Sequence, residues 1–366
     1  MKITEIPVVG YERVTRCDDP DNGLTAFISV HDTTLGPALG GMRMWPYLSE
    51  KEAFTDVNRL AMGMTYKSAV AETGMGGGKA VIIGDPETGK STRLLQAMGR
   101  FVDSLGGLYI TAEDVGMSVD DMVIVRQQTP YVTGLPQANG SSGNPAPMTA
   151  RGIFLGMQAC LERQLQTERF TAVRIAVQGC GNVASHLCAH LKAAGAELIV
   201  TDIAPEKAQA LAARHGARVV APEDIYHVDC EVYAPCALGG TLNAMTIPQL
   251  KCAIVAGSAN NQCLDDEQGD HLRQRGILYA PDFVINAGGV LNIAMELAPG
   301  GYNQERAMAK VCHIANVLRD IFDMAERQHL ATHRAAILLA ERKLAEARAS
   351  KEGGSAGANT QAATHQ

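Results

Sequence analysis

Lysines and carboxylates next to short apolar runs are the residues in the first half of the chain whose types suit chemistry. Lys79 follows three glycines, residues 76–78, and leads into the apolar run 80–83, which is typical of a buried strand. The glycines remove every side chain ahead of the lysine, so backbone or a ligand can approach closely there. Burial lowers the pKa of a lysine, and such a lysine can act as an acid or a base near neutral pH. A glycine-rich turn whose lysine points to solvent is the alternative interpretation.

A second lysine, Lys67, lies twelve positions before Lys79. The capping box at residues 49–52, SEKE, is followed by apolar residues at helical spacing, which predicts a helix. Gly63 fits a C-terminal stop, so we expect Lys67 just past the end of this helix. A solvated lysine at that place favours the helix dipole and needs no other role, so this interpretation stays open.

Two carboxylates, Glu113 and Asp114, follow an apolar run at residues 108–111 that predicts a short strand. Ligands of α/β proteins bind at the carboxyl ends of strands, so these side chains are candidate functional groups. The alternative for Asp114 is a structural role as the N-cap of the helix predicted at residues 119–127.

A pair of glycines, Gly40 and Gly41, lies in a loop predicted at residues 31–43, after a strand predicted at residues 24–30. Like the glycines before Lys79, they allow a close approach of backbone or ligand. The apolar residues Leu39 and Met42 flank the pair.

A nucleotide-binding pattern opens the second half of the chain. In order, it comprises a buried strand (173–178), the turn Gly179-Cys180-Gly181-Asn182-Val183-Ala184, a helix (183–194), a strand (197–201) and Asp202. The turn matches G-x-G-x-x-A, in which glycines let a pyrophosphate approach the N-terminus of the helix. Asp202 is suited to accept hydrogen bonds from the adenosine ribose and to repel the additional phosphate of NADP. The pattern therefore predicts NAD as the cofactor.

Three further strands, predicted at residues 231–234, 253–256 and 277–279, lead into segments rich in glycine and amide side chains. Asn260 and Asn261 are the first candidates for contacts to a nicotinamide or a substrate carboxylate. We expect Cys236 to pack near the cofactor and not to act as a nucleophile, because the local sequence supplies no base for it. Two helices are predicted in the last part of the chain, at about residues 304–327 and 332–347.

Length, charge and cysteine content limit the classes of function. The 366 residues suffice for two domains, and the net charge of −7 without a strong basic run argues against nucleic acid as a main partner. We identify no bilayer-spanning apolar run and no signal peptide, so we expect a cytoplasmic protein without a membrane partner. Nine scattered cysteines without a C-x-x-C pair indicate free thiols in a reducing compartment, with no disulfide framework and no metal site.

Several long motifs in a fixed order resemble one enzyme family. They are HDTTLGPALGG, RLAMGMTYK, GGGKAVIIGDP, YITAEDVG, SSGNPAP, YAPCALGG, AGSANNQ and YAPDFVINAGGV. Together they resemble the Glu/Leu/Phe/Val amino-acid dehydrogenases, and the leucine-specific members most closely. The resemblance covers the chain to about Arg348.

The resemblance implies an α/β fold with two domains and an active site in the cleft between them. Residues 1–147, with a C-terminal helix at about 331–349, are expected to form the substrate-binding and oligomerisation domain. Residues 148–330 are expected to form a Rossmann NAD-binding domain, and residues 350–366 a disordered tail. The assembly implied is a homo-oligomer, an octamer or a dimer.

The implied reaction is the reversible NAD-dependent oxidative deamination of an L-amino acid to its 2-oxo acid and ammonia. By similarity, Lys67 holds the substrate carboxylate, Lys79 activates water, and Asp114 exchanges protons with the substrate nitrogen. The other substrate-site residues implied are Leu39, Gly40, Gly41, Met64, Ala112, Thr133 and Val290. The cofactor-site residues implied are Gly179, Gly181, Asn182, Val183, Asp202, Cys236, Ala237, Asn260, Asn261 and Asn286.

The apolar residues expected around the substrate side chain predict which amino acids are accepted. Leu39 stands where glutamate-specific relatives have a lysine, and with Met64 and Val290 it forms an apolar wall that leaves a charged side chain without a partner. Leucine, isoleucine and valine fit such a wall, and one methylene discriminates by only ~1–3 kcal/mol. Met42 and Met295 depart from the usual threonine and aspartate of the leucine enzymes. An aromatic amino-acid dehydrogenase, or a nucleotide-sensing protein without turnover, is the alternative function.

Overall fold

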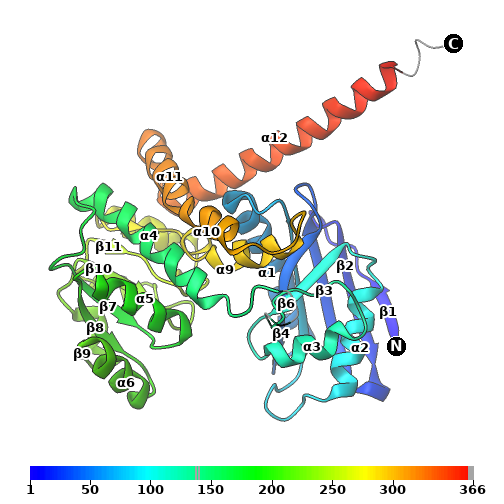
Figure 1. The fold of residues 1–366 in the computed structure, drawn as a ribbon, viewed down its shortest axis with the longest axis horizontal. Coiled ribbons are helices and arrows are strands. Elements are labelled where there is room, and N and C mark those ends of the chain that lie inside the picture. Colours follow the sequence, from blue (N-terminus) through cyan, green and yellow to red (C-terminus); the bar gives the residue numbers. More distant parts are fainter. Residues whose placement is uncertain (137, 139–140, 362–366) are drawn as a thin grey trace. The chain divides into compact units, whose positions relative to one another are not determined.

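The computed structural model describes residues 1–136, 138 and 141–361, and the chain divides into two compact units (Figure 1). The first unit comprises Met1–Gly143, Glu296–Tyr302 and Ala340–Gln366, and the second comprises Asn144–Met295 and Asn303–Leu339. No helix in the described part of the chain is long and apolar enough to cross a membrane.

The first unit is built on a mixed six-stranded sheet. Its strands are β1 (Lys2–Glu5), β2 (Arg13–Asp19), β3 (Leu24–Asp32), β4 (Ala38–Trp45), β5 (Gly76–Ile83) and β6 (Tyr109–Glu113), in the spatial order β1-β2-β3-β5-β4-β6. Strand β4 lies between β5 and β6 and runs parallel to both, whereas β1, β2, β3 and β5 pair antiparallel. The carboxyl ends of β4, β5 and β6 therefore lie side by side.

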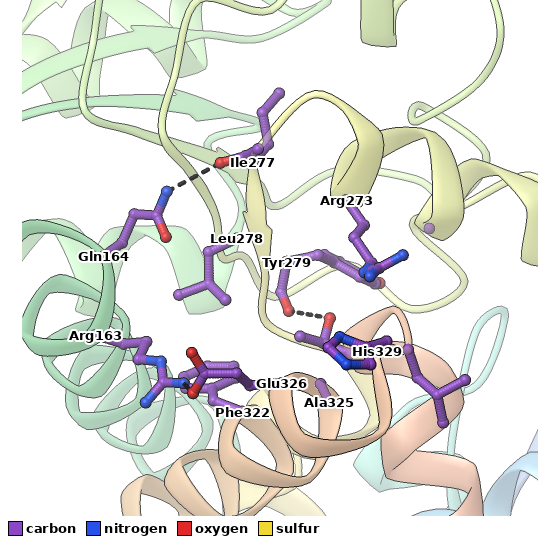
Figure 2. Close-up of a pocket in the computed structure, with 14 residues that line it drawn as sticks. Arg163, Gln164, Arg273, Ile277, Leu278, Tyr279, Phe322, Ala325, Glu326 and His329 are labelled. Carbon is purple, nitrogen blue, oxygen red and sulfur yellow. Dashed lines mark hydrogen bonds and ion pairs between the residues drawn. The ribbon is translucent and has the colours of Figure 1, made fainter.

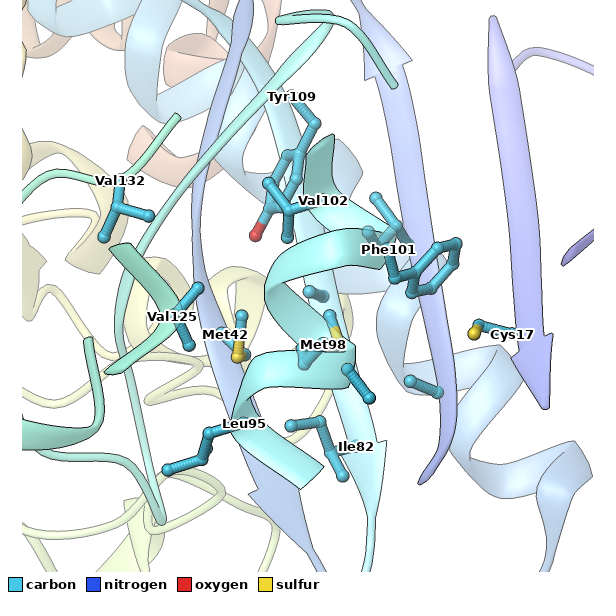
Figure 3. Packing of buried hydrophobic residues seen from close by; sticks show 14 of the residues in the cluster. Cys17, Met42, Ile82, Leu95, Met98, Phe101, Val102, Tyr109, Val125 and Val132 are labelled. Atoms are coloured by element: carbon cyan, nitrogen blue, oxygen red, sulfur yellow. The ribbon is translucent and has the colours of Figure 1, made fainter. Parts of the chain in front are cut away.

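Helices cover both faces of this sheet. On one face, α2 (Thr92–Asp103) and α3 (Val119–Arg126) pack on a large apolar cluster that includes Met98, Phe101 and Tyr109 (Figure 3). On the other face, a smaller cluster joins α1 (Glu50–Ala71) to β3 and β5. Because side chains alternate along a strand, β5 sends Ala80 and Ile82 to the α2 face and Val81 to the α1 face.

The predicted end of the first helix is wrong. Helix α1 begins as expected after Ser49, whose Oγ accepts a hydrogen bond from the Glu52 backbone N–H, but it continues past Gly63 to Ala71 and ends at the left-handed Glu72. Gly63 is an exposed helix residue, and a glycine there costs only ~1 kcal/mol against alanine, which packing of the helix against the sheet outweighs. Lys67 therefore lies inside α1 and not beyond it.

The predicted loop at residues 31–43 is also wrong, because residues 38–45 form β4. Glycine is unfavourable in a strand, so Gly40 and Gly41 suggest a loop when the sequence is considered alone. In the fold, a Cβ at Gly40 would lie 1.8 Å from the Gly78 carbonyl oxygen, so only glycine fits between the neighbouring strands there.

The second unit is a parallel sheet with helices. Its strands are β7 (Arg174–Gln178), β8 (Glu197–Thr201), β9 (Arg218–Val219), β10 (Val232–Pro235), β11 (Ile254–Val255) and β12 (Leu278–Tyr279). Its helices are α4 (Ala146–Leu165), α5 (Asn182–Ala193), α6 (Pro205–His215), α7 (Asp266–Gln274), α8 (Asp282–Ile285), α9 (Gly288–Ala294), α10 (Gln304–Cys312) and α11 (Ile314–Gln328). The strand order, β12-β11-β10-β7-β8-β9, is that of a dinucleotide-binding sheet, with its switch point between β7 and β10. The predicted α/β fold class with a Rossmann-type sheet is confirmed.

The helix predicted at residues 304–327 is two helices, α10 and α11, which meet at His313. Neither proline nor glycine marks this break, and His313 keeps right-handed helical dihedrals, so the sequence contains no signal for it. The last helix is α12 (Thr332–Gln361), whose part from Ala340 onward belongs to the first unit. Within that unit Lys343 pairs with Glu72, and Arg348 pairs with Asp32. The tail predicted at residues 350–366 overlaps its end, and residues 362–366 lie outside the described part.

Candidate active site

A buried ion pair joins two of the candidate residues. The Nζ atom of Lys79 on β5 lies 2.5 Å from Oδ2 of Asp114, which follows β6, and the two side chains are 8% and 19% exposed. Helix α3 is capped by Ser118, so the structure excludes the N-cap alternative for Asp114. It also excludes the solvated-turn alternative for Lys79, which is a buried strand residue.

Two cationic neighbours, Lys79 and Arg43, set the protonation of Asp114. Burial by itself raises the pKa of this carboxyl, but Lys79 and then Arg43 outweigh burial and hold the pKa at about 2. Burial, and then the charge of Asp114, raise the pKa of the adjacent Glu113. Two neighbouring carboxyls whose pKa values are pushed apart are a pattern found in acid–base sites. Of the two, Asp114 is the one that stays ionised at neutral pH.

The lowered pKa of Asp114 predicts a pH-dependent contribution to stability. A carboxyl whose pKa falls on folding stabilises the native state above its unfolded pKa and loses this effect as pH falls through its folded pKa. The pKa falls from 3.8 to about 2, which corresponds to roughly 2 kcal/mol at neutral pH. We therefore expect Asp114→Asn to unfold at lower temperature than the wild type at pH 7, with the difference shrinking between about pH 4 and pH 2. Thermal unfolding over this range is the measurement, and a constant difference would contradict the ion pair.

The glycines of β4 make the approach of the two catalytic candidates possible. A Cβ at Gly41 would lie 2.7 Å from the Glu113 carbonyl oxygen and 2.8 Å from the Asp114 Cβ. The close approach predicted for this glycine pair is therefore to the neighbouring strands of the sheet. This close packing brings Asp114, at the end of β6, against β4, the strand that lies between β6 and the Lys79 strand β5.

The other candidates for the substrate site in the first unit surround this pair of glycines. Leu39, Ala112 and Thr133 are buried, with exposed fractions of 1%, 4% and 1%. Thr133 donates hydrogen bonds from its N–H and its hydroxyl to the Thr111 carbonyl oxygen, at 2.8 and 3.1 Å. Met64 lies beside Gly40, with its Cγ 3.4 Å from the position of a Cβ there. These residues form a contiguous group where the first half of β4 pairs with the carboxyl end of β6.

The two remaining substrate-site candidates lie on helices. Lys67 is half-buried on α1, three residues after Met64 and hence on the same side of that helix. Val290 is half-buried on α9, which belongs to the second unit.

Sequence reasoning missed a chain of charged residues behind Asp114. Arg43 Nε lies 3.2 Å from Asp114 Oδ2, and Arg43 Nη1 lies 3.1 Å from Asp56 Oδ2. The hydroxyl of Tyr47 donates to the same Asp56 oxygen at 2.6 Å. The signal was the alternation of side chains along β4, which cannot be used when residues 31–43 are assigned to a loop.

Glu296 was also missed, and it anchors the segment that follows Thr133. Its carboxylate accepts hydrogen bonds from the backbone N–H groups of Gly134 and Ser142, at 3.1 and 2.9 Å, and from the Ser142 hydroxyl. No feature of the sequence pairs a glutamate at position 296 with residues more than 150 positions earlier.

The two methionines that depart from the leucine enzymes have different surroundings. Met42 is completely buried in the apolar cluster under α2 (Figure 3). Arg43, the next residue, points to the opposite face of the sheet, where it pairs with Asp56 of α1. Met295 is half-buried at the end of α9. Met42 therefore contributes to the core of the first unit.

The glycine turn of the second unit lies at the switch point of its sheet. Gly179 has a φ of +99°, and a Cβ there would lie 2.8 Å from Ala237, which follows β10. The Cys180 N–H donates to Asp202 Oδ2 at 2.7 Å, and the Ala204 N–H donates to Oδ1 at 2.9 Å, so the Asp202 carboxylate is fixed at the end of β8.

The first turn of α5 provides space for an anion. Apart from its chain neighbours, a Cβ added at Gly181 would have no other heavy atom within 4 Å, and no side chain forms a capping hydrogen bond at this end of α5. Asn182 and Val183, also named as cofactor residues, form the first turn, where helix N–H groups attract anions. This arrangement suits the binding of an anion.

Asn260 and Asn261 lie beside the segment that follows β10. Gly239 follows β10 and packs against their backbone carbonyl groups. A Cβ at Gly239 would lie 2.6 Å from the Asn260 carbonyl oxygen and 2.7 Å from that of Asn261. Asn286 is buried and donates from Nδ2 to Asn260 Oδ1 at 2.9 Å, while its Oδ1 has no hydrogen-bond partner among the described residues. Burial raises the pKa of the Cys236 thiol, which disfavours the thiolate a nucleophile would need.

A surface cavity of the second unit, of about 300 Å³, lies away from these residues (Figure 2). It is lined by residues of α4, α7, α11 and β12, and its Arg163 is paired with Asp323 and Glu326. None of the predicted site residues lines it. Among the residues described, no group of three or more His, Cys, Asp or Glu side chains is placed to hold a metal ion.

Comparisons with known proteins agree with the family resemblance. Residues 11–131 match the dimerisation domain of the Glu/Leu/Phe/Val dehydrogenases, and residues 200–352 match the Glutamate/Leucine/Phenylalanine/Valine dehydrogenase model. The chain is 53% identical to a leucine dehydrogenase of Bacillus cereus, covering 92% of this chain and 91% of the relative. It is 46% identical to an L-tryptophan dehydrogenase of Nostoc punctiforme, covering 94% and 96%. A crystal structure of L-tryptophan dehydrogenase from Nostoc punctiforme matches with a TM-score of 0.80 at 44% identity, covering 93% and 97%. The chain therefore belongs to the Glu/Leu/Phe/Val dehydrogenase family.

Proposed function

We propose that the protein catalyses the reversible, NAD-dependent oxidative deamination of a branched-chain L-amino acid. The substrates are leucine, and also isoleucine or valine, and the products are the 2-oxo acid, ammonia and NADH. The observation that carries the proposal is the buried contact of 2.5 Å between Lys79 and Asp114. It occurs in a chain of this dehydrogenase family that is 53% identical to a leucine dehydrogenase.

Lys67, Lys79 and Asp114 divide the work on the substrate. In the proposal, the Lys67 ammonium binds the substrate α-carboxylate and thereby orients the amino acid. Lys79 acts as the acid and base that activates water for attack on the iminium carbon, and Asp114 exchanges protons with the substrate nitrogen. The pair is coupled: a proton that leaves Lys79 removes the largest of the charges that lower the pKa of Asp114. Asp114 then becomes a better proton acceptor.

The residues at the edge of the second sheet fit NAD. The open space around Gly181 and the uncapped start of α5 suit a pyrophosphate, and the fixed Asp202 carboxylate suits ribose hydroxyls. The buried Asn286 Oδ1, without a partner among the described residues, suits a carboxamide N–H donor. When bound, NAD accepts the hydride from the substrate Cα. Asp202 would repel a phosphate at the ribose 2′ position, so NAD is preferred over NADP.

The apolar residues around Gly40 support an aliphatic substrate. Leu39 and Ala112 are buried and Met64 lies beside Gly40, so these side chains offer no partner to a charged group. Burying an unpaired charge costs several kcal/mol or more, which excludes glutamate as a good substrate. A methylene is worth only ~1–3 kcal/mol, so discrimination among leucine, isoleucine and valine is modest.

A panel of L-amino acids tests this function. With NAD as cofactor and NADH absorbance as the readout, we expect kcat/KM to be greatest for leucine, isoleucine and valine. Glutamate is expected to be slower than these by about 100-fold or more, for the reason given above. NADP is the matched control for the role of Asp202 and should support little turnover. A higher kcat/KM for phenylalanine or tryptophan would establish the aromatic alternative, and NAD binding without turnover on any amino acid would establish the sensing alternative.

The assembly and the compartment form part of the same proposal. A match to a dimerisation domain over residues 11–131 supports a homo-oligomer, an octamer or a dimer, which light scattering of the purified protein distinguishes. All nine cysteines of the chain are free, which supports a reducing, cytoplasmic location.

A further inference from the structure

Arg43 connects the Lys79–Asp114 pair to a second carboxylate on another element. The arginine lies on β4, between the strands that carry Lys79 and Asp114. Its Nε contacts Asp114 Oδ2 at 3.2 Å, the same oxygen that Lys79 contacts at 2.5 Å. Its Nη1 contacts Asp56 on α1 at 3.1 Å. One guanidinium thus joins the sheet to the helix that covers it.

Asp56 holds Arg43 in this orientation. Its Oδ2 accepts hydrogen bonds from Arg43 at 3.1 Å and from the Tyr47 hydroxyl at 2.6 Å. The side chains of Arg43 and Asp56 are only 21% and 27% exposed, so solvent screens them incompletely. The planar fork of an arginine suits this double contact, because Nε and Nη1 point in fixed directions, whereas a lysine ammonium is a single point.

We propose that Arg43 is a positioning residue for the reaction: it holds Asp114 directed at Lys79 and keeps it a carboxylate until it accepts a proton from the substrate nitrogen. This inference rests on the proposed function. In that reaction Lys79 loses and regains a proton, and while it is neutral Asp114 lacks one of its two cationic neighbours. An unpaired buried carboxylate is unfavourable and would take up a proton. Arginine keeps its charge at all accessible pH values, so Arg43 keeps Asp114 ionised during this stage.

The other charged groups near Asp114 do not replace Arg43. Glu113, on the same strand end, is itself a carboxyl whose pKa is raised by burial and then by Asp114. Burial is the main cause that raises the pKa of Tyr109 on β6, so its hydroxyl carries no charge at neutral pH. Asp56 and Tyr47 contact Arg43 and add no positive charge. Among these described groups, Lys79 and Arg43 are the cations that the structure places against Asp114.

The test is the pH profile of kcat for Arg43→Gln, with leucine and NAD at saturating concentrations. Removing an adjacent positive charge raises the pKa of a carboxyl by about one unit or more, so we expect the acidic limb to move to higher pH by about that amount. At neutral pH we also expect kcat to fall by about tenfold or more, because, while Lys79 is neutral, Asp114 then has neither cation beside it and takes up a proton. KM for leucine should change by less than about threefold. Arg43→Lys keeps the charge and is expected to keep the acidic limb near that of the wild type. Asp56→Asn, which frees Arg43 from α1, should give an intermediate loss of kcat.

Arg16→Gln is the matched control. Arg16 also bridges two carboxylates, Asp18 at 2.7 Å and Glu50 at 2.6 Å, and the same substitution there should leave the profile of kcat unchanged. An acidic limb of Arg43→Gln that superimposes on the wild type, or a loss seen only in KM or in the unfolding temperature, would overturn the inference. If Arg43→Gln does not fold, Arg43→Lys decides. If Arg43→Lys has a reduced kcat and its acidic limb moves to higher pH by about one unit or more, the positive charge at this position is not what matters.

A measurement without turnover separates this inference from the proposed function. Thermal unfolding of Arg43→Gln, Asp114→Asn and the double variant at pH 7 gives the coupling between the two residues. We expect the double variant to be more stable than the sum of the single effects predicts, because either single substitution already removes the contact between Arg43 and Asp114. A wild type without turnover on any amino acid, but with this coupling, would defeat the proposed function alone. Additive effects together with normal turnover would defeat the role of Arg43 alone.

Discussion

Lys79→Ala is expected to lower kcat for the deamination of leucine by about 100-fold to 10,000-fold, the range of a general acid–base group. The reason is that Lys79 is the cation in contact with Asp114 at 2.5 Å, in a site where both side chains are largely buried. NAD affinity should be unchanged, because the glycine turn and Asp202 belong to the second unit. Stopped-flow or steady-state NADH formation, together with an NAD titration, makes the measurement.

Lys90→Ala is the matched control for this variant. Lys90 also forms an ion pair with an aspartate of the first unit, Asp121 in the first turn of α3, at 2.8 Å, but it has no part in the proposed site. We expect its kcat to remain close to that of the wild type. Lys79→Ala also leaves Asp114 with one cation fewer, so its unfolding temperature should be measured to confirm folding. Undiminished turnover of a folded Lys79→Ala protein would remove Lys79 from the mechanism.

Gly41→Ala is expected to lower kcat by about 100-fold, the effect of displacing a catalytic group by roughly 1 Å. A Cβ at this position would overlap the Glu113 carbonyl oxygen at 2.7 Å and the Asp114 Cβ at 2.8 Å. Neither is the far end of a flexible side chain, so the end of β6 must move, and Asp114 moves with it. Gly41 has no left-handed φ, so the substitution acts through space alone.

Gly63→Ala is the matched control, because it adds the same methyl group to a glycine of the same unit. A Cβ at Gly63 meets nothing within 4 Å, and the residue is exposed on α1. There alanine should stabilise the protein by about 0.5–1 kcal/mol through its helix propensity, with kcat unchanged. Normal kcat for Gly41→Ala, measured beside this control, would show that the sheet accommodates the methyl group without moving Asp114.

Local patterns in the sequence predicted the second unit well. The turn at Gly179, the helix after it and Asp202 at the end of the next strand are consecutive in the chain, so their contacts follow from short-range geometry. The α10–α11 break at His313 was not predictable, because it has no breaker residue and the backbone stays right-handed there. The C-terminal end of α1 and the start of β4 were missed for a related reason: packing against the sheet outweighs the local preference of glycine.

The sequence by itself determined the residue types of the candidate site, the glycine turn of the second unit and the family to which the chain belongs, because these are carried by contiguous motifs. Only the tertiary structure decided that β4 lies between the strands that bear Lys79 and Asp114, and that Arg43 on β4 contacts Asp114. Strand order depends on how the whole apolar surface of a sheet is buried, and not on any one segment of the chain. For that reason the contact between Arg43 and Asp114, whose residues are 71 positions apart, is visible in the fold and absent from the motifs.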